Sequence, residues 1–441
     1  MLADPRSNRR AFLGRLGGIA GAGALAAASA RAAAAATERL HAAIAGAAAR
    51  PAVEVARDEA FWLPVQQAWD VDRSLLNFNN GSCSPAPRVA LEALFRDWRF
   101  ANELMYHHLM TILDPRREAV RTQLAGIFGA DRETIALVRN ASEALETITF
   151  GIELARGDEI LTTTHDYPRM ITAWRQREAR DGVVLKQVVL PVPLGDPADL
   201  VAAFAAAITP RTRVLHLSHI HFTTGQIGPV KALCDLARSR GIRSIVDGAH
   251  AFAHLDAKIG DIGADYYGTS LHKWLAAPVG NGMLYVRKEL IPSLWPLFAH
   301  PDPKSPDIRK FEEPGTNPVP ILLAVSEAVA LHQLIGAERK QERLRYLRDA
   351  WATPLAAEPR CRILPSLDPV HSCGIACVAI DGIEPVKLAK HLLEKELIYT
   401  APIGLPDVNA LRVTPNVYTT LAEVDRFVEA VRKVARNGLP G

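Results

Sequence analysis

Two short apolar stretches, each followed by a reactive polar residue, constrain the fold of this chain more than any other feature. Residues 244–246, Ser-Ile-Val, lead directly to Asp247, and the strand-like stretch 264–268 precedes Lys273. Parallel strands of an open α/β sheet present their carboxyl ends at one edge, where the sites of such sheets form. The two stretches therefore predict a carboxylate and an amine close together at one edge of a sheet.

An amine and a carboxylate placed in this way are the two groups that pyridoxal phosphate requires. The amine bonds to the aldehyde carbon of the cofactor, and the carboxylate keeps the ring nitrogen protonated, so that the ring accepts electrons from the substrate Cα. We therefore predict Lys273 as the catalytic residue and Asp247 as the partner of the ring nitrogen. The alternative interpretation is a surface lysine and a helix-capping aspartate.

The segment around these residues resembles the class V aminotransferase family of fold-type I pyridoxal-phosphate enzymes, and within it the isopenicillin N epimerase-like branch. It reads Asp247-Gly248-Ala249-His250, Gly263-Ala264-Asp265-Tyr266-Tyr267 and His272-Lys273-Trp274-Leu275, with Pro278 and Gly280 shortly after. The resemblance extends over about residues 79–434. It implies an α/β fold, with a large domain whose mainly parallel seven-stranded sheet lies between helices and a smaller α+β C-terminal domain.

The rest of the sequence agrees with an α/β fold. Strand-like runs at 160–163, 183–185 and 214–217 alternate with helical patterns at 197–207 and 230–239, which is typical of parallel sheets covered by helices. The 441 residues, of which 49% are hydrophobic and 22% charged, are too many for one ordinary domain. The net charge of only +3 disfavours nucleic acid as a partner and favours a small-molecule, amino-acid-type substrate.

Four segments are expected along the chain. Residues 1–36 form a signal peptide, residues 37–80 contribute to the small lobe and cover the substrate, residues 81–315 form the large cofactor-binding domain, and residues 316–441 form the small C-terminal domain. The Pro-rich stretch 301–320 marks the crossover, and an amphipathic helix at 421–434 ends the small domain.

The first forty residues indicate export. Ser7-Asn8-Arg9-Arg10-Ala11-Phe12-Leu13 precedes a Gly/Ala-rich apolar run at about 16–30, and Ala28-Ser29-Ala30 offers a cleavage site. We predict a twin-arginine signal, the twin-arginine export machinery as a partner and a periplasmic or secreted protein. The alternative is a disordered alanine-rich tail with a chance arginine pair. No other span is long and apolar enough to anchor the chain stably in a bilayer.

The five cysteines predict no disulfide framework, since at least one stays unpaired. Cys373 and Cys377 lie in an apolar strand-like run, and their spacing is weak evidence for a metal. We interpret them as buried core thiols and predict no metal site.

The cofactor phosphate needs N–H donors at a helix start and hydroxyl groups, which the stretch 139–144 provides. It resembles the family's phosphate-binding turn, so Ala141 and Ser142 are assigned to the phosphate, although Ser142 is equally a plain helix N-cap. Ser270 and His272, on either side of Leu271, look like further phosphate contacts; His272 is alternatively a packing residue.

The cofactor ring needs a flat side chain against one face. Thr164-His165-Asp166-Tyr167-Pro168 follows a strand where the family places its stacking aromatic, so His165 or Tyr167 takes that role. The resemblance also places His250 on the phenolic-oxygen side of the cofactor. The run 311–317 resembles the family's Gly-Thr segment, which implies that Thr316 touches the neighbouring subunit's phosphate in a homodimer; the alternative is an ordinary Pro-Gly turn.

The substrate carboxylate needs a fixed cation, and the planar fork of arginine binds carboxylates through two hydrogen bonds. Leu411-Arg412-Val413-Thr414-Pro415 looks like the family's carboxylate-binding strand, and Asn79-Asn80-Gly81-Ser82 resembles the segment that folds over the substrate. We therefore assign Arg412 and Asn80 to the substrate. The alternatives are that Arg412 is a surface charge and that Asn80-Gly81 forms an ordinary turn.

The sequence leaves the reaction at Cα open between transamination and epimerisation. A two-base epimerase needs a second base, for which His165, Tyr167 and His108 are the candidates. A cysteine desulfurase or C–S lyase is disfavoured, since the late stretch 397–404 lacks the cysteine that a desulfurase requires; a lyase that works without a cysteine stays an alternative. The export signal adds a resemblance to exported family members that modify a siderophore precursor by oxidation of a glutamate side chain. The alternative function is therefore an exported enzyme that modifies a siderophore or peptide side chain. A non-catalytic binding protein on the same fold is the remaining alternative.

Overall fold

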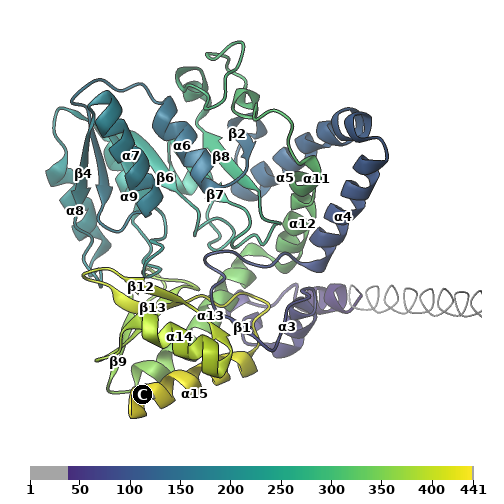
Figure 1. Ribbon diagram of the computed structural model, residues 1–441, viewed down its shortest axis with the longest axis vertical. Coiled ribbons are helices and arrows are strands. Elements are labelled where there is room, and N and C mark those ends of the chain that lie inside the picture. The colour runs from purple at the N-terminus through teal and green to yellow at the C-terminus, as the bar shows by residue number, and fades with distance from the viewer. Residues whose placement is uncertain (1–37, 440–441) are drawn as a thin grey trace, which may run out of the picture.

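The computed structural model describes residues 38–439, so the signal peptide predicted at 1–36 lies outside the described residues. Figure 1 shows two lobes. The upper lobe in that view contains the large sheet and its helices. The lower lobe combines the C-terminal part of the chain, in yellow, with segments from the beginning of the described chain, in purple.

The large lobe is built on a seven-stranded sheet with the order β2-β8-β7-β6-β5-β3-β4. Neighbouring strands are parallel from β7 to β4, whereas β8 runs antiparallel to both β7 and β2. The predicted mainly parallel sheet is therefore confirmed. The strands are β2 (Ile135–Val138), β3 (Glu159–Thr163), β4 (Val184–Val188), β5 (Thr212–Ser218), β6 (Arg243–Asp247), β7 (Tyr266–Ser270) and β8 (Gly282–Val286).

Both faces of this sheet are buried, which is why its strands are nearly continuously apolar. Successive residues of one strand enter different core clusters: Ile245 packs in one and Val246 in the other, as do Tyr266 and Tyr267. The helices that accompany these strands are α5 (Arg117–Phe128), α6 (Ala141–Gly151), α7 (Pro168–Asp181), α8 (Pro197–Ala207), α9 (Val230–Ser239) and α10 (Ile259–Ile262). This layering holds the carboxyl ends of β5, β6 and β7 at one edge.

The small lobe is an antiparallel four-stranded sheet with the order β12-β13-β10-β9 and packed helices. A two-residue strand from the beginning of the chain, β1 (Leu76–Asn77), pairs in parallel with β11 (Ile398–Tyr399). The other elements are β9 (Cys361–Leu364), β10 (Ala376–Ile380), β12 (Ala401–Gly404), β13 (Asn409–Val413), α13 (Ala337–Ala356), α14 (Pro385–Glu396) and α15 (Leu421–Asn437). Thr420 and Glu423 form a capping box at the start of α15.

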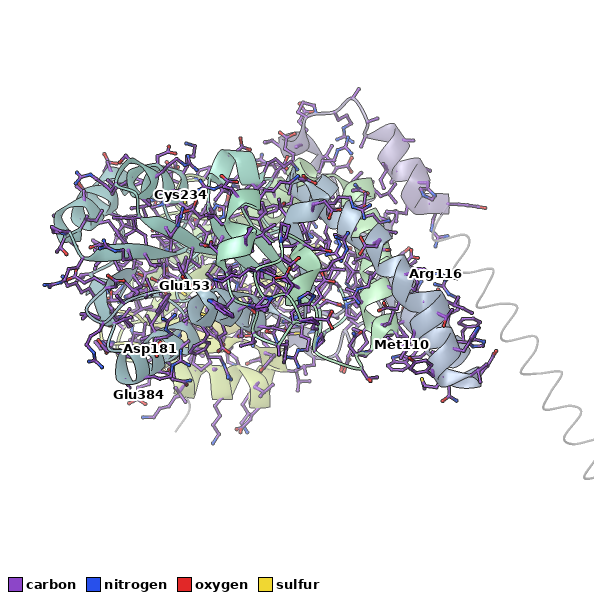
Figure 2. All side chains as sticks on the ribbon, turned by 90° about the horizontal axis from the view of Figure 1, so that it is seen from above. Met110, Arg116, Glu153, Asp181, Cys234 and Glu384 are labelled. Atoms are coloured by element: carbon purple, nitrogen blue, oxygen red, sulfur yellow. The ribbon has the colours of Figure 1, made fainter. Side chains whose placement is uncertain are left out.

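A helical arm stands away from the body on one side. It contains α4 (Arg88–Glu103) and a π-helix, η1 (His107–Leu113), followed by the 3-10 turn η2 (Asp114–Arg116). Figure 2 shows Met110 and Arg116 on this protruding part. The chain before the arm holds a helix at 38–46, α2 (Ala52–Val55) and α3 (Glu59–Gln66). Three side chains near the turn between α4 and η1 are largely exposed: Leu104 (58%), Met105 (44%) and Tyr106 (80%).

The passage between the lobes lies later than the boundary predicted at residue 316. After that residue come α11 (Val319–Leu323) and α12 (Val325–Ile335), and both contact α4 and α5 beside the large sheet. The reason is the apolar face of α12, which is buried there. The chain enters the small lobe with α13, which contacts β9, β10 and α15. Short 3-10 turns complete the fold: η3 (Arg132–Thr134), η4 (Lys288–Ser293) and η5 (Ile308–Phe311).

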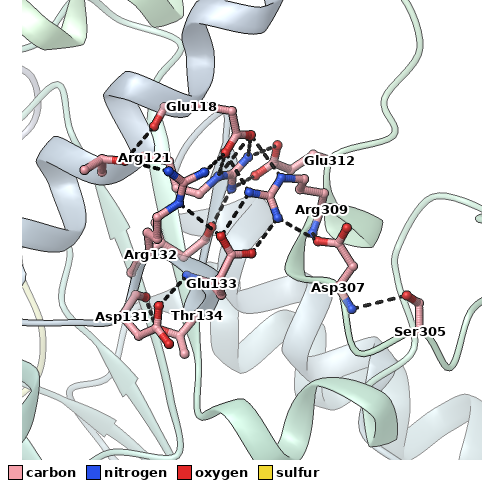
Figure 3. Close-up of polar contacts among 12 residues, drawn as sticks. Glu118, Arg121, Asp131, Arg132, Glu133, Thr134, Ser305, Asp307, Arg309 and Glu312 are labelled. Carbon is pink, nitrogen blue, oxygen red and sulfur yellow. Dashed lines mark hydrogen bonds and ion pairs between the residues drawn. The ribbon is translucent and has the colours of Figure 1, made fainter.

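A network of charged side chains ties η5 to α5 and β2 (Figure 3). Arg309 donates to both Glu118 and Glu133, and its guanidinium holds the pKa of Glu118 well below the usual range. Arg121, whose side chain is fully buried, pairs with the buried Glu312. The network therefore fixes the start of the loop 312–318 against the large lobe.

All five cysteines are free; Cys373 and Cys377 are buried in the small lobe, as predicted. Within residues 38–439 no single helix is long and apolar enough to cross a membrane, and only α11 to α13 taken together, across a bend of 80°, reach that length and composition.

Candidate active site

A cavity of about 580 Å³ lies between the two lobes at the carboxyl edge of the large sheet. Ser218, Asp247 and Ser270, the last residues of β5, β6 and β7, line it from the large lobe. Arg412 on β13 lines it from the small lobe, and Lys273 lies within it. The two residues that the sequence placed at one sheet edge are therefore brought into one cavity.

Asp247 is a buried carboxyl group, 8% exposed, at the end of β6. Burial raises its pKa, whereas the hydrogen bond that it accepts from the Ala249 N–H at 2.9 Å works in the opposite direction. Gly248 has no space for a side chain, since an added Cβ would lie 1.8 Å from the Tyr267 ring. The backbone after Asp247 therefore turns tightly against β7.

Lys273 lies on the turn that joins the antiparallel strands β7 and β8. Its Nζ is 3.2 Å from Nε2 of His250. Burial lowers the pKa of the amine from 10.5 to about 8, with Arg412 adding to the effect and Asp247 opposing it. Burial likewise lowers the pKa of His250 well below its usual value, and its Nδ1 has no hydrogen-bond partner among the described residues. A large fraction of the Lys273 amine is therefore neutral and nucleophilic near pH 8.

The N-terminus of α6 lies at the same cavity and provides an anion site. Ala141 and Ser142, its first two residues, line the cavity together with Ser270 and His272. The Ser270 hydroxyl accepts the Ala141 N–H at 2.9 Å. The structure corrects the alternative interpretation of Ser142 as the N-cap, since the side chain of Asn140 accepts the Glu143 N–H and takes that position.

Tyr167 and His165 have different surroundings. Tyr167 lines the cavity and makes an edge-on contact with Phe222, with ring centroids 5.4 Å apart. His165 is buried outside the cavity lining, and its Nε2 lies 2.6 Å from the Asp407 carboxylate in the small lobe. Of the two alternatives for the stacking residue, the geometry therefore favours Tyr167, and His165 joins the lobes behind it.

The guanidinium of Arg412 is fixed before any substrate arrives. It donates to the Phe222 carbonyl at 2.8 Å, to Asn79 at 3.2 Å and to the Ser82 hydroxyl at 3.0 Å. Its Nε is buried without a partner among the described residues. Burial lowers the pKa of Arg412, which nevertheless remains a cation at neutral pH. A rigidly held cation at the cavity that still has unpaired N–H groups suits a carboxylate ligand.

Asn80, Thr316 and His108 do not line this cavity. The amide of Asn80 is fully buried and occupied by the fold, because it donates to the Asn77 and Thr414 carbonyls and accepts from Tyr418. Asn80 therefore stabilises the fold and has no free group for a substrate. Its neighbours Gly81 and Ser82 line the cavity instead. Thr316 is exposed on the loop 312–318. His108 stacks on Phe100 in the arm.

Sequence reasoning missed the residues that orient these groups. Asp166 is a buried carboxylate that accepts hydrogen bonds from Thr162, Thr163 and Ser218 and so fixes the loop carrying Tyr167. Its place directly before an aromatic residue at a strand end was the available signal. Ser82 orients Arg412 from 330 positions away in the chain, for which no local pattern exists.

The residues present fit pyridoxal phosphate. The buried acid Asp247 suits the ring nitrogen, the start of α6 with Ser270 suits the phosphate, and Lys273 suits the aldehyde carbon. His250 and His272 both line the cavity, and the Nδ1 atom of each has no hydrogen-bond partner among residues 38–439. In the described part of the chain no group of histidine, cysteine or acidic residues is arranged to hold a metal ion.

Comparisons with known proteins agree with this fit. The sequence profile of the Aminotransferase class-V family matches residues 76–427. Isopenicillin N epimerase of Streptomyces clavuligerus is 32% identical over 84% of this chain and 98% of the relative, and that of Amycolatopsis lactamdurans is 31% identical over 85% and 99%. The fold is similar to that of the cystine C–S lyase C-DES bound to cysteine persulfide, with a TM-score of 0.75, 24% identity, and coverage of 82% and 98% of the two chains.

Proposed function

Because this chain belongs to the class V aminotransferase family of pyridoxal-phosphate-dependent enzymes, we propose that it epimerises the Cα of an amino acid or amino-acid-containing metabolite. The observation that carries the proposal is the joint placement of Lys273 and the pre-oriented Arg412 in one cavity. Two epimerases that align over nearly their whole length support this choice over transamination.

Each side chain has a task in this proposal. Arg412 binds the α-carboxylate and thereby orients the Cα–H bond. The cofactor, when bound, supplies the electron sink for the negative charge that develops at Cα. Asp247 would hold the ring nitrogen in its protonated form, and Lys273 would take up the Cα proton at its Nζ. His250, 3.2 Å from that Nζ, can share the proton.

Epimerisation further needs a proton delivered to the opposite face of Cα. Of the three residues considered from sequence, Tyr167 lines the cavity, whereas His165 and His108 do not. We therefore assign the second proton donor to Tyr167, or to Lys273 acting on both faces. Replacement of Tyr167 by Phe separates the two, because only the first slows inversion while proton removal continues.

The deciding experiment is incubation of the holoenzyme in D₂O with L- and D-amino acids and dipeptides that have a free α-carboxylate. Epimerisation predicts α-deuteration together with inversion, measured by mass spectrometry and chiral chromatography. Formation of a keto acid and loss of the substrate amine would show transamination instead. Lys273→Ala serves as the control, and the absence of α-exchange with every substrate would contradict the proposal.

Sulfur transfer is less well supported. Desulfuration requires a nucleophilic thiolate at the substrate, but no cysteine lines the cavity. Cys83 is the nearest candidate: it lines a neighbouring cavity of about 690 Å³, and partial burial raises the pKa of its thiol. A raised pKa lowers the thiolate fraction at neutral pH. Release of sulfide from L-cysteine at a rate abolished by Cys83→Ser would reverse this preference.

We also propose that the active unit is a homodimer. The exposed apolar side chains of Leu104, Met105 and Tyr106 on the arm form a surface that a second subunit would bury. In such a dimer the exposed loop with Thr316 would approach the partner's phosphate site. Analytical ultracentrifugation checks this: Tyr106→Glu is expected to shift the protein toward the monomer, and a monomeric wild type would refute it.

We propose export through the twin-arginine pathway on the basis of Arg9 and Arg10 and the apolar run after them. A periplasmic or secreted location would bring the enzyme to peptides or siderophore precursors, which is the alternative substrate class. Cell fractionation of the wild type and of an Arg9→Lys/Arg10→Lys variant tests the location. Equal retention of both proteins in the cytoplasm would contradict export.

A further inference from the structure

Lys340 is a buried lysine without an acidic partner in the part of the chain that the structure describes. It lies in the first turn of α13 and is 4% exposed, and burial alone lowers the pKa of its amine to about 7. A cation near a helix N-terminus also faces the positive end of the helix dipole. An uncompensated buried ammonium therefore costs folding free energy at this position.

The hydrogen bond of this amine is directed at the turn that carries the catalytic lysine. Lys340 Nζ donates to the carbonyl oxygen of Trp274, the residue immediately after Lys273. The three preceding carbonyls of the turn, those of residues 271–273, accept backbone N–H groups of Ala277, Ser84 and Ala276 at 2.9–3.2 Å. Of these four carbonyls, only that of Trp274 accepts a hydrogen bond from a side chain in the described residues. This side chain comes from α13, the helix that leads into the small lobe.

We propose that Lys340 is a positioning residue that fixes the turn of Lys273 by holding the Trp274 carbonyl. The costly buried amine is retained for this contact, since an apolar residue of the same length would suit the core better. The inference rests on the assignment of Lys273 as the lysine that bonds to the cofactor, and does not depend on which reaction follows.

His254 supports the same turn through the Trp274 ring. Its ring stacks on Trp274 with centroids 3.8 Å apart and 19° between the planes. Its Nδ1 donates to the His250 carbonyl at 2.8 Å, and the Gly374 N–H donates to its Nε2 at 2.8 Å. Burial lowers the pKa of His254 to about 3, so the ring stays neutral and keeps both bonds. The imidazole of His254 therefore links the Trp274 ring to His250, the residue that contacts Lys273.

The test uses the full-length apoprotein and pyridoxal phosphate, without any substrate. Lys340→Met keeps the side-chain length and removes both the charge and the hydrogen bond. We expect the Tm of the apoprotein to equal or exceed that of the wild type, because the buried charge is gone. We expect the bond between Lys273 and the cofactor to form about tenfold more slowly, followed by visible absorbance and by borohydride trapping with mass spectrometry of the Lys273 peptide.

Arg343→Met is the matched control, because Arg343 is a buried cation one turn further along α13 that contacts the Ala56 carbonyl and Glu59 instead. It is expected to lower the Tm and leave the loading rate unchanged. Loading of Lys340→Met at the wild-type rate, or equal slowing in both variants, would overturn the proposal. If Lys340→Met does not fold, Lys340→Gln retains a donor at shorter reach; failure of both to fold would show that the core itself requires the lysine and would also overturn it.

The outcome is separate from that of the proposed epimerisation. Loading is measured before any substrate is added, so an enzyme that proves to be a transaminase leaves this test intact. Conversely, a confirmed epimerase whose Lys340→Met variant loads normally refutes only the positioning role.

Discussion

Nζ of Lys273 lies 3.2 Å from Nε2 of His250 at one edge of the sheet, where the histidine is buried and the lysine is half-buried. Burial lowers the pKa of both groups, and the charge of each would disfavour a charge on the other. Near neutral pH at most one of the two groups, the amine or the imidazole, is therefore positively charged. This arrangement keeps the amine ready both to bond to an aldehyde and to accept a proton.

The lowered pKa of Lys273 predicts how cofactor loading depends on pH. Only the neutral amine attacks the aldehyde, so the loading rate of the apoprotein should rise with pH and level off above about 8. An ordinary lysine would keep gaining rate up to about pH 10.4. Stopped-flow absorbance at a fixed cofactor concentration measures the profile, and a rate that still rises between pH 9 and 10 would show that burial does not tune this amine.

Asp247→Asn should separate cofactor binding from catalysis. Lys273 remains to bond to the cofactor, but an amide holds the ring nitrogen protonated far less well than a carboxylate. We expect kcat to fall by about 10²-fold or more, with the cofactor still trapped by borohydride. Asp235→Asn on the surface of α9 is the control, and an Asp247→Asn enzyme within about threefold of wild type would remove Asp247 from its assigned role.

Arg412→Lys should weaken substrate binding although the charge is retained. A lysine lacks the planar fork and cannot keep the bonds to Phe222, Asn79 and Ser82 while it binds a carboxylate. Loss of such a buried contact costs about 2–5 kcal/mol, which would appear as a fall in kcat/KM with unchanged cofactor absorbance. Arg362→Lys, exposed on β9 of the same sheet, should behave as wild type. Equal kinetics of the two variants would argue against a carboxylate at Arg412.

Tyr167→Ala should weaken cofactor binding more than His165→Ala. An aromatic contact is worth about 0.5–1.5 kcal/mol beyond the area that it buries, so the Kd of the cofactor should rise about tenfold in Tyr167→Ala and little in Tyr167→Phe. His165 contacts Asp407 and Thr223 instead of the cavity. Fluorescence titration of the apoproteins provides the comparison, and the reverse order would assign the ring face to His165.

Glu312→Gln should destabilise the fold, because it removes the buried one of the two carboxylates that pair with the fully buried Arg121 and leaves only the partly exposed Glu118. Breaking a buried pair in this way costs about 3–5 kcal/mol. Glu133→Gln alters the same network at a half-exposed position and should cost only about 0–1 kcal/mol. Urea unfolding at equilibrium measures both. Similar losses of unfolding free energy in the two variants would mean that burial does not set the strength of these pairs.

Local sequence signals predicted the regular elements of the large lobe well. The observed α8 and α9 coincide with the expected ranges 197–207 and 230–239, since each begins beside a proline and has a defined apolar periodicity. β2 and β8 received no assignment, because short, fully apolar strands have no periodic signature and their antiparallel pairing depends on distant partners.

Among the cavity residues, too, those with a local sequence signal were predictable and those fixed by distant contacts were not. Asp247 and Lys273 were predictable, because Asp247 ends β6, Lys273 follows β7, and both strands end at one edge of the sheet. Asn80 was assigned to the substrate, but its amide is occupied by groups around Thr414 and Tyr418, which are more than 330 positions away. Its burial could not be inferred from an Asn-Gly pair, which by itself indicates an exposed turn.

The pairing of β1 with β11 joins segments that are separated by more than 300 residues, and the Asn79–Thr414 bridge continues it toward Ser82 and Arg412. The substrate pocket is thus closed by one segment from early in the chain and one from late in the chain. A chain truncated inside α14 would contain Lys273, Asp247 and the phosphate-binding turn, but it would lack Arg412, the cation for the substrate carboxylate. Competence to bind substrate therefore requires that synthesis of the chain has passed β13, which carries Arg412.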